Sequence, residues 1–247
     1  MPYRKFELRS SWLWFVGAVV LVFGLLLLTR LLTRAPAEPV AKPALDPAKG
    51  NLEVFTRLIG SIRIDSAALR PLSPEMRQFL AGIDTMVTNR ELRDAITRME
   101  RAAKRFSPRE RAALNAYAGL CQFELANPNA ALVQFEKALA GAQELPGLAA
   151  CVAFNIGYLF LRYDQPESAL FYWSRAETLL LSSVTDSVLI QTLLPQLLNN
   201  LGVAWEVRAD TAQARNYYQA AAQFIDTTAV NESANRLRRN LRRTSAR

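Results

Sequence analysis

Three segments of the sequence share one internal spacing of glycine, alanine and aromatic residues. In each, a glycine is followed after twelve residues by an alanine, after four more by an aromatic residue, and after three more by a second alanine. The three sets are Gly119, Ala131, Phe135 and Ala138; Gly157, Ala169, Trp173 and Ala176; and Gly202, Ala214, Tyr218 and Ala221. Self-similarity at a fixed period indicates a repeat array, in which each unit buries its apolar face by stacking on its neighbours. The spacing therefore predicts stacked units of a kind that binds other proteins.

Each unit is expected to be a pair of helices. In the second unit, Ile156 and Phe160 fall on one face at helical spacing, and Pro166 suits the first turn of a following helix. The small residue Gly157 lets the two helices approach closely, and Trp173 fills the space beside it. Alanine and leucine dominate the second half of the chain, which suits an all-helical protein.

The three blocks resemble the tetratricopeptide repeat. The first helix of that family has four characteristic positions: a large residue, a leucine, a small residue that is glycine or alanine, and a tyrosine. The second helix has an alanine, an aromatic residue and a second alanine. Ile156 and Leu201 stand at the leucine position and Phe160 and Trp205 at the tyrosine position, whereas Gln122 departs from it. The family pattern ends each repeat with a proline, and at this position the three blocks have Gln143, Leu181 and Asp226 instead. The resemblance implies an all-α fold, a right-handed α-solenoid of three or four hairpins. Together with the segments at the two ends of the chain, described below, the expected architecture is an N-terminal transmembrane helix, the solenoid and a C-terminal capping helix.

A degenerate copy is expected before the three clear ones. Ala95, Met99 and Ala102 repeat the spacing of the second helix, and a weak first helix would cover residues 76–87. The last repeat begins late, so residues 179–194 are expected to extend the flanking helices, with Pro195 starting or kinking the next one. The predicted division is 1–34 for a tail and membrane anchor, 35–50 for a linker, 51–110 for N-terminal helices with the degenerate repeat, 111–229 for three repeats, and 230–247 for a basic capping helix.

Residues 10–29 carry no charge, and twenty helical residues are long enough to cross a bilayer. Trp12 and Trp14 stand at one end, where interfacial indoles belong. We expect a single-pass protein bound to the lipid bilayer through residues 10–29, with its N-terminus in the cytoplasm. The repeat domain would then be extracytoplasmic, in the periplasm of a bacterium. The alternative is a signal peptide cleaved near the sequence from Ala35 to Ala37.

Residues 35–50 hold four prolines. Proline fixes φ and removes a backbone donor, so this stretch is expected to be an extended spacer. A collapsed tether is the alternative and would have a shorter reach.

The residue types present exclude several classes of chemistry. The chain contains no histidine, which removes histidine metal sites and histidine general bases. Cys121 and Cys151 are expected to be free, buried thiols, because their positions in neighbouring repeats are too far apart for a disulfide. We expect no catalytic residue, no cofactor and no metal, and therefore no enzyme.

The resemblance assigns a peptide-binding groove to the first helix of each repeat. Asn155 and Asn200 share one repeat position, where an amide can both donate to and accept from the backbone of an extended peptide. Solvated asparagines and aromatic residues packed between helices are the alternative. A carboxylate clamp is not expected, because Ala116 and Gln196 occupy two of its basic positions. The groove residues are Tyr117, Leu120, Phe123, Phe154, Asn155, Tyr158, Arg162, Asn199, Asn200, Val203 and Glu206.

Basic residues are concentrated at the two ends of the chain. Residues 1–34 hold five basic side chains and one acidic one, and residues 231–247 hold six and one. The C-terminal helix is expected to cap the array with a polar outer face. Alternatively, it binds an anion such as an acidic partner, a lipid headgroup or a nucleic acid through Arg236, Arg238, Arg239, Arg242 and Arg243. A nucleic-acid-binding body is not expected, because the middle of the chain is not basic.

The predicted function is a membrane-tethered module that recruits a protein partner or peptide segment. It would be accessory to a secretion, translocation or envelope-assembly complex. Two alternatives remain open at this point. The chain could be a permanent scaffold subunit of a larger membrane complex, or it could dock anions or nucleic acid through the arginine-rich C-terminus.

Overall fold

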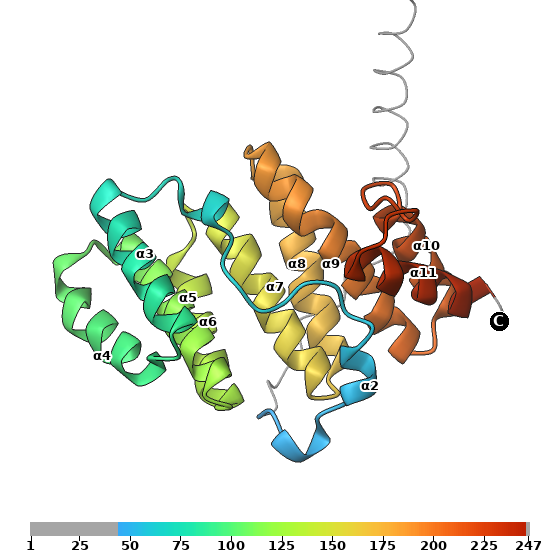
Figure 1. The fold of residues 1–247 in the computed structure, drawn as a ribbon, viewed down its shortest axis with the longest axis horizontal. Coiled ribbons are helices and arrows are strands. Elements are labelled where there is room, and N and C mark those ends of the chain that lie inside the picture. The colour runs from blue at the N-terminus through green and yellow to red at the C-terminus, as the bar shows by residue number, and fades with distance from the viewer. Residues whose placement is uncertain (1–43, 246–247) are drawn as a thin grey trace, which may run out of the picture. The chain divides into compact units, whose positions relative to one another are not determined.

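Four helical hairpins follow one another through the part of the chain that the structure describes. The computed structural model describes residues 44–245, and these form helices, turns and extended segments without any strand (Figure 1). The predicted all-α fold class is therefore confirmed. The hairpins are α3 (Pro74–Thr88) with α4 (Leu92–Ala102), α5 (Pro108–Glu124) with α6 (Pro128–Gly141), α7 (Pro146–Arg162) with α8 (Pro166–Ser182), and α9 (Ser187–Val207) with α10 (Thr211–Ala221).

Shorter elements surround these hairpins. Before them lie η1 (Pro47–Lys49), α2 (Leu52–Phe55) and η2 (Ser66–Leu69); η3 (Ala103–Arg105) ends the first hairpin, and α11 (Glu232–Ser245) follows the last. The most extensive packing joins the two helices of each of the last three hairpins, and α6 with α7 and α8 with α9 pack next most extensively. Successive hairpins therefore stack in chain order, as units that share a core must do.

Proline marks the start of five of these helices. It occupies the first helical position of α3, α5, α6, α7 and α8. The first backbone N–H of a helix has no intrahelical partner and proline already has a helical φ, so this position suits it. Helix α5 also carries a capping box, in which the Ser107 hydroxyl accepts from Glu110 N–H and the Glu110 carboxylate accepts from Ser107 N–H.

The two helices of every hairpin are joined by the same turn. One residue in each turn has a left-handed backbone, with φ of 65° at Arg90, 59° at Ala126, 59° at Asp164 and 64° at Ala209. The following residue donates its N–H to the carbonyl five residues earlier, over 2.9 to 3.0 Å. This is the Schellman arrangement, which satisfies the last carbonyls of the first helix. The same turn therefore joins the helices of all four hairpins, including α3–α4, which occupies the region expected to hold a degenerate copy.

The spacing of glycine and aromatic residue that three segments share produces the same contact in each of three hairpins. A Cβ added to Gly119 would lie 2.6 Å from the Phe135 ring, and one added to Gly157 would lie 2.6 Å from Trp173 Cδ1. At Gly202 the corresponding distance to the Tyr218 ring is 2.5 Å. The aromatic ring of the second helix therefore lies directly on the glycine of the first, and no larger residue fits there.

Helix α9 begins earlier than the position of Pro195 suggested. It starts at Ser187, where the Asp186 carboxylate accepts from Val188 and Leu189 N–H, and runs for 21 residues. Pro195 lies inside this helix, so the prediction that it starts the helix is wrong. The extra residues of the last repeat are accommodated by this additional N-terminal length.

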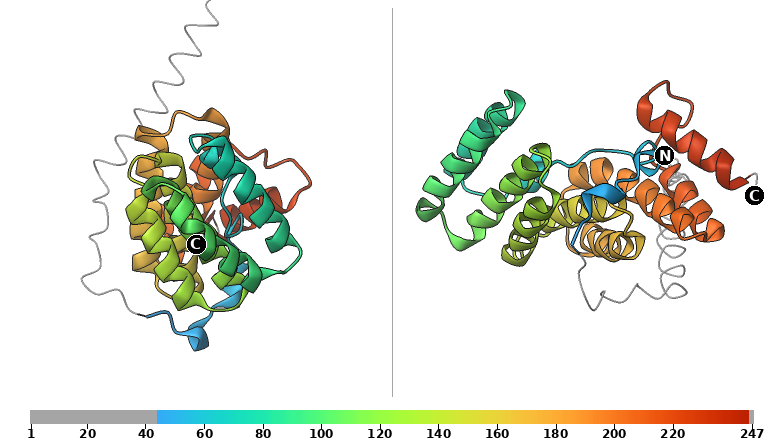
Figure 2. Two further views of the ribbon diagram at one scale, coloured as in Figure 1. Left: turned by 90° about the vertical axis from the view of Figure 1, so that its left-hand side faces the viewer. Right: turned by 90° about the horizontal axis from the view of Figure 1, so that it is seen from below.

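Most of residues 56–73 is not helical, although N-terminal helices were expected there. Only the short η2 interrupts this segment. It passes over the hairpins from α2 towards α3, and the view from below shows it running between α3 and α11 (Figures 1 and 2). One residue of the expected spacer, Leu45, also packs on the fold, whereas residues 48–50 are exposed. Leu45 is buried, its N–H donates to Asn129 Oδ1 over 2.8 Å, and its carbonyl accepts from Asn129 Nδ2 over 3.0 Å.

The predicted membrane-spanning segment, residues 10–29, lies outside the described residues, as do the tail and residues 35–43 of the linker. Among residues 44–245, no helix combines the length and the apolar character that crossing a bilayer requires. The predicted localisation as a single-pass membrane protein is therefore not supported.

Candidate functional site

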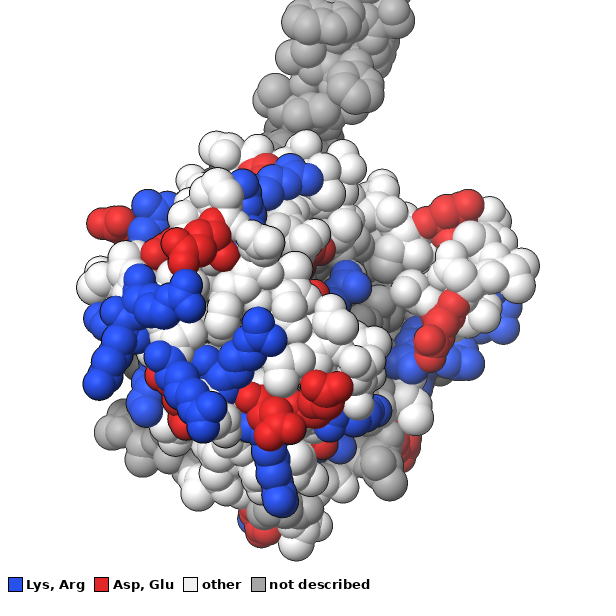
Figure 3. All heavy atoms as spheres, turned by 60° about the vertical axis from the view of Figure 1, so that its left-hand side comes forward, with Lys and Arg blue, Asp and Glu red and all other residues white. Residues whose placement is uncertain are grey.

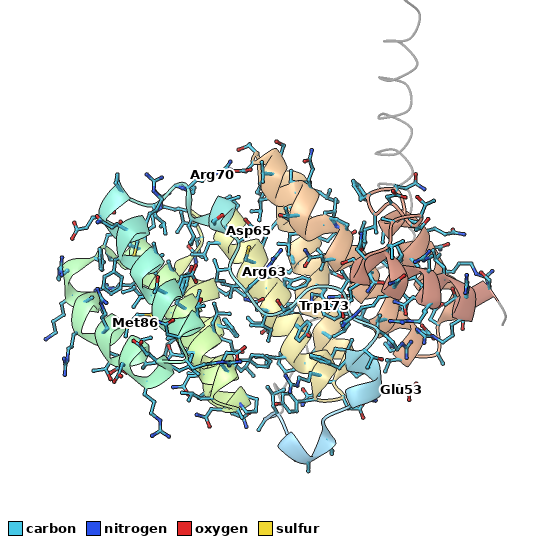
Figure 4. All side chains as sticks on the ribbon, in the orientation of Figure 1. Glu53, Arg63, Asp65, Arg70, Met86 and Trp173 are labelled. Atoms are coloured by element: carbon cyan, nitrogen blue, oxygen red, sulfur yellow. The ribbon has the colours of Figure 1, made fainter. Side chains whose placement is uncertain are left out.

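Residues 57–65, here called the strap, cross the face formed by α7 and α9. We call that face, which carries most of the predicted groove residues, the inner face. Arg63 and Asp65 mark the strap where it passes α7 (Figure 4). The end of the strap is held by Thr192 of α9, whose hydroxyl donates to Asp65 Oδ2 over 3.0 Å. The segment thus lies where the sequence analysis expected a foreign peptide.

Two asparagines of the inner face bind the strap backbone in the same way. Asn200 Oδ1 accepts from Ile59 N–H over 2.8 Å, and Asn200 Nδ2 donates to Ile59 O over 3.1 Å. One repeat earlier, Asn155 Oδ1 accepts from Arg63 N–H over 3.3 Å, and its Nδ2 donates to Arg63 O over 3.0 Å. Both side chains are fully buried. Each therefore uses both ends of its amide to satisfy one residue of a segment that has no helix or sheet to do so.

Two further asparagines converge on the carbonyl of Arg57. Asn199 Nδ2 donates to it over 3.1 Å, and Asn240 Nδ2, from α11, donates to it over 3.0 Å. Asn240 Nδ2 also donates to Asn199 Oδ1 over 2.9 Å. The C-terminal helix therefore contributes to the site together with α9.

A buried carboxylate binds the first side chain of the strap. Glu206 Oε2 lies 2.5 Å from Arg57 Nη2, and its Oε1 lies 2.7 Å from Nε of Arg243 on α11. The Tyr218 hydroxyl donates to Glu206 Oε2 over 2.9 Å. Only 4% of the Glu206 side chain is exposed, so these partners replace the water contacts that the carboxylate loses on burial. Burial is the main cause that raises the pKa of Tyr218, and the neighbouring Glu206 raises it further, so this phenol remains a donor.

Aromatic and cationic side chains surround the beginning of the same segment. The Arg162 guanidinium lies over the rings of Phe55 and Phe123, at 5.2 Å and 5.0 Å from their centroids. The ring of Tyr158 meets that of Phe55 edge to face at 5.8 Å, and burial raises the pKa of Tyr158 to about 12. The backbone N–H of Asn51 donates to Arg162 O over 3.0 Å. These contacts fix α2 against the end of α7.

The remaining predicted groove residues lie in the core. Leu120, Phe154 and Val203 are buried, and the Phe154 carbonyl accepts from Trp173 Nε1 over 2.9 Å. Tyr117 is buried next to Asp84 of α3; burial is the main cause that raises its pKa, and Asp84 adds to the effect. These four side chains support the helices of the site.

The arginines of α11 do not all face outward. Arg236 donates to Leu58 O and pairs with Glu232, and Arg243 pairs with Glu206, so both hold the strap or its surroundings. Arg238 donates to Asn235 Oδ1. Arg239 and Arg242 are exposed. The proposed anion-binding set is thus divided between inward and outward positions.

The opposite end of the array carries mixed charge. Basic side chains gather with acidic ones on the face that includes α3 and α4 (Figure 3). Arg105 pairs with Glu75 at 2.9 Å and Arg90 with Glu124 at 2.5 Å, and all four side chains are well exposed. Exposed pairs of this kind add little to stability.

Both cysteines are free and buried, as predicted. Cys151 lies on α7 under the end of the strap, next to the backbone of Asp65. Burial raises the pKa of Cys151 to about 12 and that of Cys121 to about 11. Both thiols are therefore protonated near neutral pH.

Three contributors to the site escaped sequence reasoning: Arg57, Thr192 and Asn240. All three lie outside the three recognised blocks of residues 119–138, 157–176 and 202–221. The one available signal was the run of aliphatic residues from Leu58 to Ile64 around Gly60, which lacks helical periodicity.

No protein-family model matches the sequence, and no curated protein is significantly similar to it.

Proposed function

We propose that this protein is a non-catalytic interaction module of the tetratricopeptide-repeat kind, which binds an extended segment of a partner polypeptide on its inner face. The observation that carries the proposal is the pairing of Asn155 and Asn200 with the backbone of the strap. An amide that satisfies both the N–H and the C=O of one residue recognises a peptide through groups that every sequence has. The site therefore has the chemistry of a peptide receptor.

The repeat geometry supports this proposal. The four turns with one left-handed residue and the three contacts of glycine with an aromatic ring give hairpins of one design. Stacked hairpins of this design build an α-solenoid whose first helices line one surface. In this protein the first helices α7 and α9 carry the asparagines, which places equivalent donors one repeat apart along a bound peptide.

The polar groups of the inner face also favour binding over catalysis. The amides hydrogen-bond to backbone, and the one buried carboxylate among them, Glu206, is already paired with Arg57 and Arg243. Both carboxylate oxygens are occupied by these contacts and by the Tyr218 hydroxyl, which leaves neither oxygen open to a substrate. We therefore assign the site no chemical step.

Site-specific photo-crosslinking in the source cell tests the proposal. Benzoylphenylalanine replaces Phe123, which is half-buried beside Arg162, and in a matched chain it replaces Phe224, an exposed aromatic residue after α10. We expect adducts with a discrete polypeptide at position 123 that are absent at position 224. Asn155→Ala and Asn200→Ala together should remove these adducts. Adducts that are equal at both positions, or that survive both substitutions, would refute the inner-face assignment.

A permanent scaffold subunit is the second candidate. The observation that favours it is the complete burial of Leu58 and Ile59 of the strap, which fills the inner face with the chain's own residues. A partner would then bind the outer helices, and the adducts would form at position 224 and at Val133 of α6.

A further inference from the structure

The strap interface holds most of the polar groups that this fold buries. Eight polar or charged residues are buried among the described ones, and five of them contact the strap. These five are Asn155, Asn199, Asn200, Glu206 and Asn240. The seams between helices are instead filled by apolar residues, as at Gly157 and Trp173. A surface rich in amides and charges resembles an exchangeable interface more than a permanent core.

Releasing the strap would therefore require less free energy than separating two helices. The amides and the carboxylate of the inner face would exchange their strap partners for water, which satisfies them again. The apolar loss would be the exposure of Leu58 and Ile59 and of the partly buried Ile62 and Ile64. Low-energy openings of native proteins occur where few apolar contacts must be broken.

The strap is also not part of any hairpin. It has no regular secondary structure and lies between the one-turn helix α2 and the short η2. A cavity of about 320 Å³ lies along it, lined by Gly60 and Arg63 of the strap, Gln196 of α9 and Arg236 of α11. The strap is consequently not packed on every side.

The side chains of the strap show what the inner face selects. Arg57 pairs with Glu206, and the next two side chains, Leu58 and Ile59, are buried. At Gly60 the backbone has φ of 86°, and an added Cβ would lie 2.1 Å from Gln196 Oε1. The accepted pattern is a basic residue, two aliphatic residues and a glycine.

Given the proposed function, on which this step rests, we propose that the strap is an intramolecular ligand that occupies the inner face in the absence of a partner. An extended peptide with the same pattern, a basic residue followed by two aliphatic residues and glycine, displaces it. Because the strap is covalently attached, its effective concentration is on the order of millimolar. A competing peptide therefore binds the intact chain weakly until the strap is weakened.

Complementation by a synthetic peptide tests this proposal. The probe is a fluorescein-labelled peptide with the sequence of residues 56–66, and the receptor is the full chain carrying Ile59→Asp, which places a charge where Ile59 is buried. We expect this chain to bind the probe about tenfold or more tightly than the unsubstituted chain, because its own strap competes less well. A probe with Ile59→Asp should not bind, and a chain with the matched exposed substitution Val133→Asp should behave like the unsubstituted one.

Hydrogen exchange gives the outcome that would overturn the proposal. If the strap amides of the Ile59→Asp chain exchange rapidly while α7 and α9 stay protected, and the probe still fails to bind, then the strap is no exchangeable ligand. If Ile59→Asp prevents folding, Arg57→Ala replaces it, since this variant removes only the pair with Glu206. The binding expected of the Arg57→Ala chain, and the result that would refute the proposal, are the same as for the Ile59→Asp chain.

Thiol labelling of the unsubstituted strap gives an independent readout. In a Cys121→Ser chain, Cys151 is covered by the end of the strap. We expect Cys151 to react faster than global unfolding allows, and a rate equal to global unfolding would count against release. Adducts at position 123 together with failed complementation would leave the proposed function intact and refute only the displaceable strap. Successful complementation without cellular adducts would support the displaceable strap and refute the proposed function.

Discussion

The side-chain amide of Asn200 forms two hydrogen bonds with the backbone of Ile59, which lies 141 residues earlier in the chain. Asn155 repeats the arrangement with Arg63 at a separation of 92 residues. The position that resembles a peptide contact of tetratricopeptide repeats thus contacts an extended peptide that belongs to the same chain. Stability of the fold and occupancy of the inner face are consequently coupled.

Replacing Asn200 with alanine should destabilise the fold by about 2–4 kcal/mol, because it leaves the buried N–H and C=O of Ile59 without partners. Asn216→Ala, at an exposed position of α10, is the matched control and should change stability by less than about 0.5 kcal/mol. Urea denaturation followed by circular dichroism measures both. Equal effects of the two substitutions would show that the Asn200 pairing contributes nothing.

Glu206→Gln should lower the free energy of unfolding by about 3–5 kcal/mol, because it leaves Arg57 and Arg243 close together without the buried carboxylate. Glu124→Gln breaks the exposed pair with Arg90 and should cost about 1 kcal/mol or less. Both variants are compared in urea at low and high salt. A loss at Glu206 no larger than that at Glu124 would contradict the central role of this carboxylate.

Gly157→Ala should destabilise the third hairpin by about 1–3 kcal/mol, because the new methyl group meets the Trp173 ring. Gly82→Ala on α3, where the nearest atom is 3.8 Å away, should instead stabilise the chain by about 0.5–1 kcal/mol through helix propensity. Thermal unfolding distinguishes the expected loss of stability in Gly157→Ala from the expected gain in Gly82→Ala. Combining Gly157→Ala with Trp173→Leu should destabilise the chain by less than the sum of the two single losses, and strict additivity would argue against the contact.

Ala209→Gly should stabilise the chain by about 0.5–1 kcal/mol, because Ala209 has φ of 64° in the turn between α9 and α10 and glycine adopts this conformation without strain. Ala81→Gly, inside α3 and exposed, is the control and should destabilise by a similar amount. Chemical denaturation measures the difference. Two losses of equal size would indicate that the turn is not strained.

Stability should fall as pH rises above about 9. Burial raises the pKa of Cys151 to about 12 and that of Cys121 to about 11 from the ordinary value of 9.0, so the unfolded chain loses these protons first. Between pH 9 and 10 each thiol should cost about 1 kcal/mol, since the folded state holds the proton that the unfolded state releases. Denaturation of a Cys121→Ala, Cys151→Ala chain should show a shallower decline. An identical decline would exclude the thiols as its cause.

The hairpins were accessible from the sequence because their contacts are local. Gly157 and Trp173 lie sixteen residues apart on adjacent helices, so a notch and the ring that fills it leave a fixed spacing in the sequence. The same reason explains why the helical class was predicted correctly. The extension of α9 into residues 187–194 agrees with the expectation that residues 179–194 lengthen the flanking helices. Only the alternative in which Pro195 starts the helix is wrong, because a proline is tolerated inside a helix when the surroundings hold that helix in place.

The sequence by itself determined the repeated hairpins and the asparagines at equivalent positions of two repeats. Only the tertiary structure decided what those asparagines bind. Asn155 and Asn200 form their hydrogen bonds with the backbone of the strap. Because almost every residue has the same backbone N–H and C=O groups, the sequence of the strap does not indicate this pairing. Arg57 and Asn240 meet across 183 residues for the same reason. Local periodicity records how helices stack, whereas the partner of a buried amide depends on which distant segment the completed fold brings to it.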